Sequence, residues 1–208
     1  MKFSDSGTLS ADDIQARIGK LTASRMGDAM AFRKDGKPTA ERTQYMREVV
    51  AERMTDVLVP HYVNAAMQWG IDNEGTAKEA YEKRTGRKIR PAGYIDHPSI
   101  EYCGATPDGY VDDGLIEVKC PTTTVYIAWL MAGTVPDQHI PQMCLQMLCT
   151  GKRWCDFVAF DPRMPEGKTM FIRRFTPTAE LLATIEAAAK QFLKECDDLF
   201  EAITTASY

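Results

Sequence analysis

The sequence has no apolar run long enough to cross a lipid bilayer, which takes about 20 residues in a helix. This absence argues against an integral membrane protein. The first residues, MKFSDSGTLSADD, also lack the apolar stretch of a secretory signal peptide, so nothing in the chain indicates export. We therefore expect the protein to act in the cytoplasm.

The cysteines and histidines lack the spacing of a metal site. No C-x-x-C pair occurs, and the cysteine spacing fits no common iron–sulfur ligand run. Most cysteines have apolar neighbours, so we expect buried reduced thiols that pack as small hydrophobic side chains. These are Cys103, Cys120, Cys144, Cys149, Cys155 and Cys196. The three histidines, His61, His97 and His139, are expected at the surface.

Positive charge is not in excess, because 25 Lys and Arg residues are outnumbered by 29 Asp and Glu residues, for a formal net charge of −4. This balance argues against a protein that coats nucleic acid through its overall charge. A local basic channel is still compatible with it, because physiological salt screens charges beyond roughly 10 Å.

What the sequence does contain is the pattern of a globular domain. Its 208 residues, 44% of them hydrophobic, suit one domain over 1–208, and no repeat or linker divides them. We expect a helical part over 1–86, a sheet core over about 87–175 and a final helix over about 178–203. Other helices are predicted at 39–59, 64–85, 123–132 and 137–149, and strands at 87–95, 102–105, 115–120, 154–160 and 169–175. This order predicts the α/β (α+β) class, with a central mixed β-sheet flanked by α-helices.

The predicted strand 115–120 carries two charges that packing does not explain. Side chains alternate along a strand, so Glu117 and Lys119 share one face, and Ile116 and Val118 point the other way. Taken alone, the charged pair could lie at a solvated sheet edge, since exposed ion pairs are common and contribute little.

A third charge, Asp108, precedes Glu117 by nine residues in PDGYVDDGLIEVK. A β-hairpin that turns near Asp112-Asp113-Gly114 would bring Asp108 back alongside the second strand. Two carboxylates and a lysine that converge form a site suited to Mg²⁺ or Mn²⁺. Such a site performs phosphodiester hydrolysis, because a bound metal lowers the pKa of water and stabilises charge growing on the phosphate. Burial of three ionisable groups without such a purpose would be costly.

Asp108 followed by Glu117-Val118-Lys119 resembles the P-D…(D/E)-x-K pattern of the restriction-endonuclease-like nucleases. Three longer segments narrow the resemblance: WGIDNEGTAKEAYEKRTG, ATPDGYVDDGLIEVKCP and HIPQMCLQMLCTGKRWCDFVAFDPRM. In this order they resemble the phage λ-exonuclease or YqaJ-type viral recombinase family of alkaline exonucleases. The resemblance covers residues 17–175 and implies a restriction-endonuclease-like core.

The resemblance implies a catalytic role for several residues. Asp108 and Glu117 would bind the metal, with the backbone carbonyl of Val118 as a further ligand. Lys119 would position or activate the attacking water. Glu74 matches a helix glutamate that reaches the metal or its water; without the family, a solvated helix carboxylate is the better interpretation.

Other positions match the family's active centre and its 5′-phosphate pocket. Gln142 matches an active-centre glutamine, and Gln146, one helical turn later, competes for the same role. In ARIGKLTASRMG, Arg17 and Ser24 match residues that bind the 5′ phosphate of the DNA end, although Ser24 could instead cap a helix. Thr106 stands where members of the family carry a serine, and threonine provides the same hydroxyl group.

The family implies a Mg²⁺-dependent enzyme, in which Mn²⁺ can substitute, that digests the 5′ strand of linear duplex DNA. The exposed 3′ strands would serve phage homologous recombination in a bacterial host. A ring-shaped homotrimer around DNA and a phage single-strand annealing protein as partner are also implied. Two alternatives stay open: a structure-specific or restriction-type endonuclease of the same superfamily, and a DNA-binding module without catalysis. The intact Asp108, Glu117 and Lys119 set argues against the second.

Overall fold

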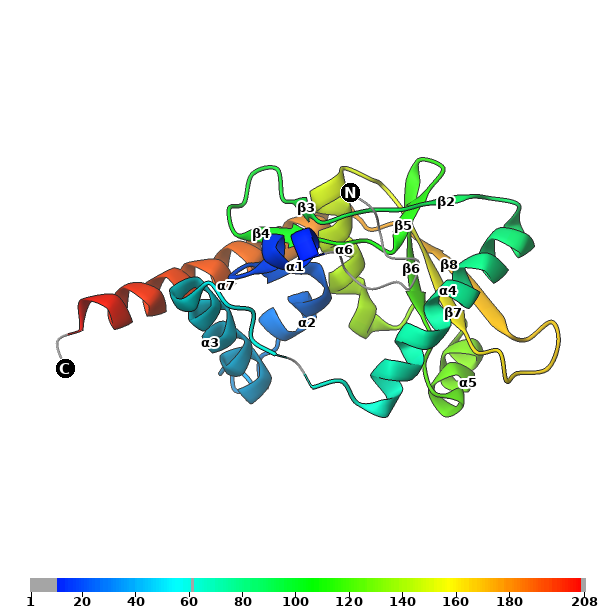
Figure 1. Ribbon diagram of the computed structural model, residues 1–208, viewed down its shortest axis with the longest axis horizontal. Helices are drawn as coiled ribbons and strands as arrows, with labels where there is room; N and C mark the ends of the chain where they lie inside the picture. Colours follow the sequence, from blue (N-terminus) through cyan, green and yellow to red (C-terminus); the bar gives the residue numbers. More distant parts are fainter. Residues whose placement is uncertain (1–10, 61, 207–208) are drawn as a thin grey trace.

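The structure is a computed structural model that describes residues 11–60 and 62–206 (Figure 1). The helices are α1 (Ala11–Arg17), α2 (Met26–Ala29), α3 (Ala40–Thr55), α4 (Ala65–Thr85), α5 (Thr123–Ala132), α6 (Ile140–Thr150) and α7 (Ala179–Thr205), with short 3₁₀ helices η1 (Ala23–Arg25) and η2 (Asp137–His139). The strands are β1 (Leu21–Thr22), β2 (Ile89–Arg90), β3 (Ile95–Asp96), β4 (Cys103–Ala105), β5 (Gly109–Val111), β6 (Gly114–Lys119), β7 (Cys155–Phe160) and β8 (Met170–Phe175).

Local side-chain chemistry sets the ends of the long helices. Thr39, Asn64 and Thr178 precede α3, α4 and α7, and each side chain accepts a hydrogen bond from a backbone N–H of the first turn. Gly86 ends α4 with φ of 71°, a left-handed conformation that glycine adopts at low cost. The predicted ends of α4 are therefore confirmed to within one residue.

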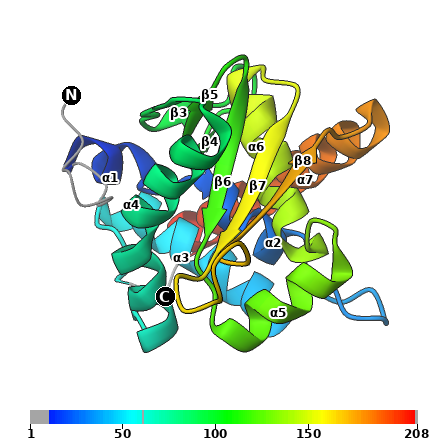
Figure 2. The same ribbon diagram turned by 90° about the vertical axis from the view of Figure 1, so that its right-hand side faces the viewer.

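A five-stranded mixed sheet, ordered β2-β5-β6-β7-β8, lies at the centre, with only β6 and β7 parallel. On one face, Ile116 and Val118 of β6 pack against Ala77 and Tyr81 of α4. On the other face, α5 and α6 cover the residues around Leu115 (Figure 2). The predicted mixed sheet flanked by helices, and the alternation along 115–120, are confirmed.

A second, three-stranded sheet of order β1-β4-β3 corrects two expectations. The predicted strand 87–95 is divided between β2 and β3, which belong to different sheets, because Pro91 has no N–H to continue the ladder. The N-terminal part is also not wholly helical, since Leu21 and Thr22 pair with β4 in parallel.

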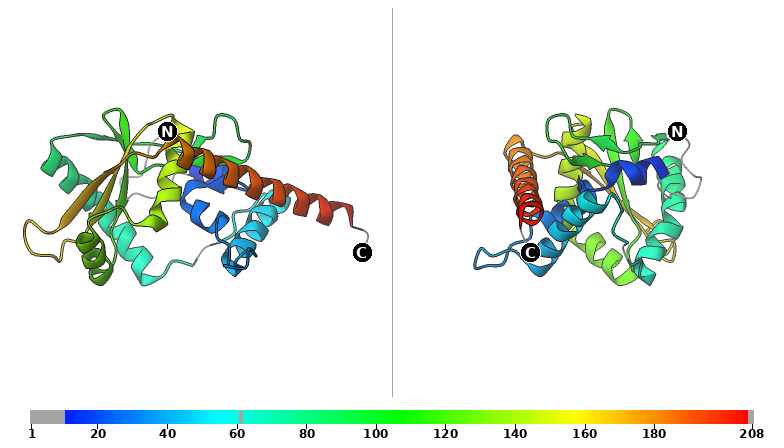
Figure 3. Two further views of the ribbon diagram at one scale, coloured as in Figure 1. Left: turned by 180° about the vertical axis from the view of Figure 1, so that it is seen from behind. Right: turned by 60° about the vertical axis from the view of Figure 1, so that its left-hand side comes forward.

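The small sheet packs in a separate apolar cluster with α2, α3, α6 and α7. One stripe of α7, including Phe192 and Cys196, faces this cluster, whereas its last turns extend beyond the rest of the molecule (Figure 3). All six cysteines are buried free thiols, as predicted. Within the described residues, no helix is both long and apolar enough to span a membrane.

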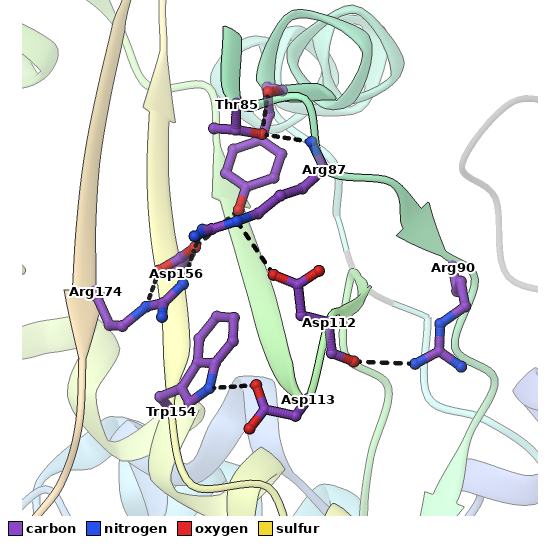
Figure 4. A network of polar contacts seen from close by, with 9 residues as sticks. Thr85, Arg87, Arg90, Asp112, Asp113, Trp154, Asp156 and Arg174 are labelled. Atoms are coloured by element: carbon purple, nitrogen blue, oxygen red, sulfur yellow. Dashed lines mark hydrogen bonds and ion pairs between the residues drawn. The ribbon is translucent and has the colours of Figure 1, made fainter. Parts of the chain in front are cut away.

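One buried carboxylate joins α4, β7, β8 and the β5–β6 turn at the hairpin end of the central sheet (Figure 4). Asp156 accepts hydrogen bonds from the Tyr81 hydroxyl at 2.8 Å and from Arg174 Nε and Nη2 at 2.9 and 3.0 Å. Arg87 Nη1 lies 3.3 Å from the same carboxylate, and its Nε lies 3.1 Å from Asp112 Oδ2. The turn is therefore linked by an ion pair to Arg87, which follows α4, and through Arg87 to Asp156.

Trp154 secures the same turn from the side of β7 (Figure 4). Its Nε1 donates to Asp113 Oδ1 at 3.0 Å, and the Arg174 guanidinium lies 3.4 Å from the ring centroid. Gly114 lies against the indole so closely that a Cβ there would collide with the ring. The Asp-Asp-Gly turn is thus held on two sides.

Candidate active site

The β5–β6 hairpin brings Asp108 and Glu117 together. Its antiparallel register pairs Gly109 with Ile116, so one further step places Asp108 opposite Glu117. Residues that oppose each other in antiparallel strands project from the same face. At the turn, Asp112 adopts φ of 51°, which aspartate tolerates better than most residues. The hairpin predicted from the sequence is therefore present.

Glu117 is the most enclosed charge of the site. Its exposed fraction is 0%, its Oε2 accepts from Gln146 Nε2 at 2.7 Å, and its Oε1 forms an ion pair with Lys119 Nζ at 2.5 Å. Across the hairpin, Asp108 Oδ2 accepts from the backbone N–H of Val118 at 2.6 Å. A buried carboxylate needs partners of this kind, because an unpaired charge in the interior is costly.

The glutamine that contacts this centre is Gln146 rather than Gln142. Gln146 is fully buried on α6 and donates to Glu117, whereas no hydrogen bond joins Gln142 to another described residue. The two residues lie one turn apart on the same side of α6, and Gln146 is the one whose turn lies beside Glu117. The resemblance to the family alone did not separate the two positions.

The pKa values of Asp108 and Lys119 are both raised, although burial acts in opposite senses on the two groups. Burial, together with the charges of Glu117 and Glu74, raises the pKa of Asp108 to about 8. Burial alone would lower the pKa of Lys119, but Glu117 and Asp108 outweigh it and raise that pKa above its ordinary value. Without a cation, Asp108 therefore holds a proton near neutral pH while Lys119 stays charged.

Glu74 stands at the edge of this group rather than inside it. It lies on α4, one turn before the residues that pack on β6, and forms an ion pair with Lys78 at 2.6 Å. Its charge still reaches the centre, because it contributes to the raised pKa of Asp108. Among the described residues, no three His, Cys, Asp or Glu side chains are gathered closely enough to hold a metal ion.

The donor set nevertheless fits a hard divalent cation. Carboxylate, amide and backbone oxygens are the ligands that Mg²⁺ and Mn²⁺ prefer. Gln146 Oε1 is buried without a hydrogen-bond partner, and Glu117 Oε1 has only the Lys119 ammonium beside it. Asp108 and Glu117 would supply the side-chain ligands, and a buried oxygen without a partner beside them is what a cation or its water shell would satisfy.

The Arg17 side chain lies in a polar region of the N-terminal part. It is half-buried at the end of α1, and no hydrogen bond or ion pair joins it to another described residue. Burial lowers its pKa despite the nearby Tyr45 and Tyr94. A guanidinium that keeps its donors free and partly desolvated is suited to an anion with several oxygens.

Ser24 and Thr106 follow two strands that pair in parallel. Ser24 lies in η1, directly after β1, and Thr106 follows β4 and precedes Asp108 by two residues. The exposed Ser24 hydroxyl lies 3.3 Å from the Thr22 hydroxyl, and the Thr106 hydroxyl is buried without a partner. The two residues therefore lie at the same ends of neighbouring strands.

Tyr45 is a residue of this region that is not among the site residues predicted from the sequence. Its hydroxyl accepts from the Thr22 N–H at 3.1 Å, and Arg25 lies 4.1 Å from its ring centroid. The ring also stacks on Phe192 of α7. Tyr45 holds the segment that carries Ser24. The only feature of the sequence that could have indicated this role is the hydroxyl of the tyrosine.

The histidines correct the expectation of surface placement. His139 stacks on Phe157 with centroids 5.5 Å apart, and burial, with the nearby Lys119, lowers its pKa to about 4. His97 is 8% exposed, and its Nδ1 accepts from the backbone N–H groups of Ser99 and Ile100. His61 lies outside the described residues.

Comparisons with known proteins agree with this geometry. A family model described as the YqaJ-like viral recombinase domain matches residues 14–153. The alkaline exonuclease LHK-Exo from Laribacter hongkongensis is 40% identical, with TM-score 0.85 over 94% of this chain and 96% of its own. LHK-Exo in complex with dAMP gives 40% identity and TM-score 0.86 over 93% and 96%.

A phage-related exonuclease from Haemophilus somnus 129PT is 17% identical, with TM-score 0.66 over 88% of this chain and 96% of its own, which is a likeness of fold alone. No curated protein matches. The predicted restriction-endonuclease-like α/β core is confirmed by the LHK-Exo structures.

The raised pKa of Asp108 predicts a pH-dependent stability in the absence of metal. A carboxyl whose pKa is higher in the folded than in the unfolded state binds more protons when folded, so its contribution falls as pH rises from about 4 to about 8. The slope from this group is at most about 1.4 kcal/mol per pH unit. Thermal melting in EDTA should show a steeper loss for wild type than for Asp108→Asn, which cannot ionise. Parallel curves would contradict the shift.

Proposed function

Because the chain belongs to the YqaJ-like viral recombinase domain family, we propose that it is a Mg²⁺-dependent exonuclease acting on duplex DNA from the 5′ end. The protein is a nuclease, that is, a phosphodiesterase. The finer proposal is that it digests the 5′-terminated strand of linear DNA and leaves 3′ single strands for phage recombination. Mn²⁺ is expected to substitute for Mg²⁺.

The observation that supports this proposal most is the placement of Asp108 opposite Glu117, with Lys119 on the same face. Asp108, Glu117 and the Val118 carbonyl are the proposed metal ligands, and Glu74 would reach the site through a water molecule. When bound, the cation would act as a Lewis acid on the scissile phosphate and lower the pKa of the attacking water.

The chain's own residues have separate tasks in this scheme. Lys119 keeps its proton, because its pKa is raised, so it serves as a donor that orients the attacking water or a phosphate oxygen. Gln146 holds one oxygen of Glu117, and Lys119 pairs with the other, which the cation would share. Asp108 releases its proton when the cation binds, so metal binding is favoured at alkaline pH, in keeping with the description of LHK-Exo as an alkaline exonuclease.

The 5′ specificity is assigned to Arg17, Ser24 and Thr106. A terminal phosphate between them would lie beside the carboxylate centre, since Thr106 precedes Asp108 by two residues. The planar guanidinium of Arg17 and the two hydroxyls are donors for a dianion. This pocket would position the first internucleotide bond at the metal.

We further propose a homotrimeric ring with DNA threaded through it. An acidic chain and a polyanionic substrate are compatible if Lys and Arg of three subunits line the channel, where positive potential concentrates. A phage single-strand annealing protein is the proposed partner for the exposed 3′ strand, in the cytoplasm of a bacterial host.

Loss of any member of the centre should abolish cleavage without unfolding the protein. We expect Asp108→Asn, Glu117→Gln and Lys119→Ala to lower the rate by roughly 100-fold or more. The assay uses end-labelled linear and closed circular duplex DNA with Mg²⁺ or EDTA. Shortening of 5′ strands on linear DNA alone supports the proposal, and cleavage of circles would indicate an endonuclease. Full activity of any of the three variants would disprove the centre.

The two glutamines provide an internal comparison. Gln146→Ala removes a hydrogen bond to a buried carboxylate and should slow cleavage by roughly 10-fold or more. Gln142→Ala, one turn away, should change the rate much less. Equal losses, or a larger loss for Gln142, would reassign the active-centre glutamine.

Arg17→Ala should impair DNA ends with a 5′ phosphate more than ends with a 5′ hydroxyl, because only the former offers a terminal dianion. We expect a difference of about 10-fold between the two substrates. Rates on matched duplexes test this, with Tyr94→Phe as a control that leaves the guanidinium in place. Identical losses would assign Arg17 to packing.

Light scattering at micromolar concentration tests the ring. We expect a mass three times that of the 23.3 kDa chain, and processive digestion of long duplexes by that species. A protein that stays monomeric with DNA and still digests processively would rule out the ring.

A further inference from the structure

Two arginines of the central sheet have nearly the same surroundings. Arg174 donates Nε and Nη2 to the buried Asp156 and covers Trp154, with 3.4 Å to the ring centroid. Arg163 donates Nε and Nη2 to the buried Asp161 at 2.7 and 2.9 Å and lies 4.0 Å from the centroid of Trp69. The arginine side chains are 42% and 47% exposed, so packing alone does not distinguish them.

The two arginines differ in where their aspartate partners lie relative to β7. Asp156 is the second residue of β7 and lies at the hairpin end of the sheet, whereas Asp161 directly follows the last residue of the strand. β6 and β7 are parallel and pair Lys119 with Ala159, so Asp161 and Lys119 lie at the same carboxyl edge.

Other contacts connect Asp161 and Arg163 to the active centre. Trp69 lies on α4, which also carries Glu74. Asp161 also accepts from the hydroxyl of Thr123, which follows Lys119 by four residues. Arg163 is thus the arginine of this pair that lies beside the proposed metal site.

Arg163 is also held in one orientation with donors to spare. Asp161 accepts two of its side-chain N–H groups, the Arg163 backbone N–H at 3.0 Å and the Thr123 hydroxyl at 2.6 Å. Trp69 covers one face of the guanidinium. Its Nη1 group donates to no acceptor among the described residues, and a preoriented guanidinium edge is suited to phosphate oxygens.

Arg174 also leaves its Nη1 group without an acceptor among the described residues, so a spare donor does not separate the two arginines. Arg87 shares Asp156 with Arg174, and the two cations face the carboxylates of Asp156 and Asp112 at the hairpin end of the sheet (Figure 4). The matched pair therefore contains one arginine at the hairpin end and one at the carboxyl edge that carries Lys119.

We propose that Arg163 is a substrate-binding residue whose free Nη1 edge contacts a backbone phosphate beside the scissile bond. Asp161 and Trp69 act as positioning residues for it. This inference rests on the proposed DNA exonuclease function and adds to it a contact with the strand that passes the metal site.

Arg163→Gln and Arg174→Gln test the proposal, because glutamine can still donate to the aspartate but carries no charge. Binding of a fluorescent duplex with a 5′ phosphate is measured in EDTA, which prevents cleavage, over a series of NaCl concentrations. One lost phosphate contact should reduce the slope of log K against log salt by about 0.9, or by about 0.7 for single-stranded DNA. We expect this change and several-fold weaker binding for Arg163→Gln, and the wild-type slope for Arg174→Gln.

An unchanged slope for a folded Arg163→Gln variant, or equal changes for both variants, would overturn the proposal. If Arg163→Gln does not fold, the double variant Asp161→Asn/Arg163→Gln replaces the ion pair by two amides and is held to the same criterion. Failure of wild type to bind DNA would instead disprove the proposed function, so the two outcomes are distinct.

Discussion

The register of the β5–β6 hairpin is the constraint on which the proposed chemistry depends. It sets Asp108 opposite Glu117 on one face of the sheet, with Lys119 two residues later on the same face. A shift of one residue would turn Glu117 and Lys119 to the α4 side and leave Asp108 without its partner. Two facing carboxylates repel each other, and burial together with that repulsion raises the pKa of Asp108 in the absence of a cation.

The energy that holds this register comes from the opposite end of the sheet. Asp112 and Asp113 of the turn are tied to Arg87 and Trp154, and Asp156 gathers Arg87 with groups from α4 and β8. Asp156 is buried and its ion pairs are charge-assisted, whereas the contacts of the turn are more exposed, and none of them occupies the catalytic edge. Because the stabilising contacts lie at the hairpin end of the sheet, the catalytic edge can keep an unsatisfied oxygen and carboxylates that repel each other, although both lower the stability there.

Much of the site was predictable because its signals are local. Asn64 and Gly86 are cap residues that set the ends of α4, and Asp-Asp-Gly is a turn sequence that places Asp108 beside Glu117. What the sequence did not reveal depends on contacts between distant elements. The choice of Gln146 over Gln142 depends on which turn of α6 lies beside β6, and the half-buried position of His139 depends on Phe157 of β7. The polar roles of Tyr45 and Arg163 have the same origin, since their partners are 23 residues away and on α4, respectively.

The central claim is that the oxygens of Asp108 and Glu117 form one cation site. Anomalous diffraction from crystals soaked in Mn²⁺ tests it most directly. We predict a single strong peak within bonding distance of both carboxylates and near the Val118 carbonyl, and no such peak in Asp108→Asn crystals. A peak elsewhere, or an active enzyme whose crystals bind no Mn²⁺ between these two residues, would contradict the account.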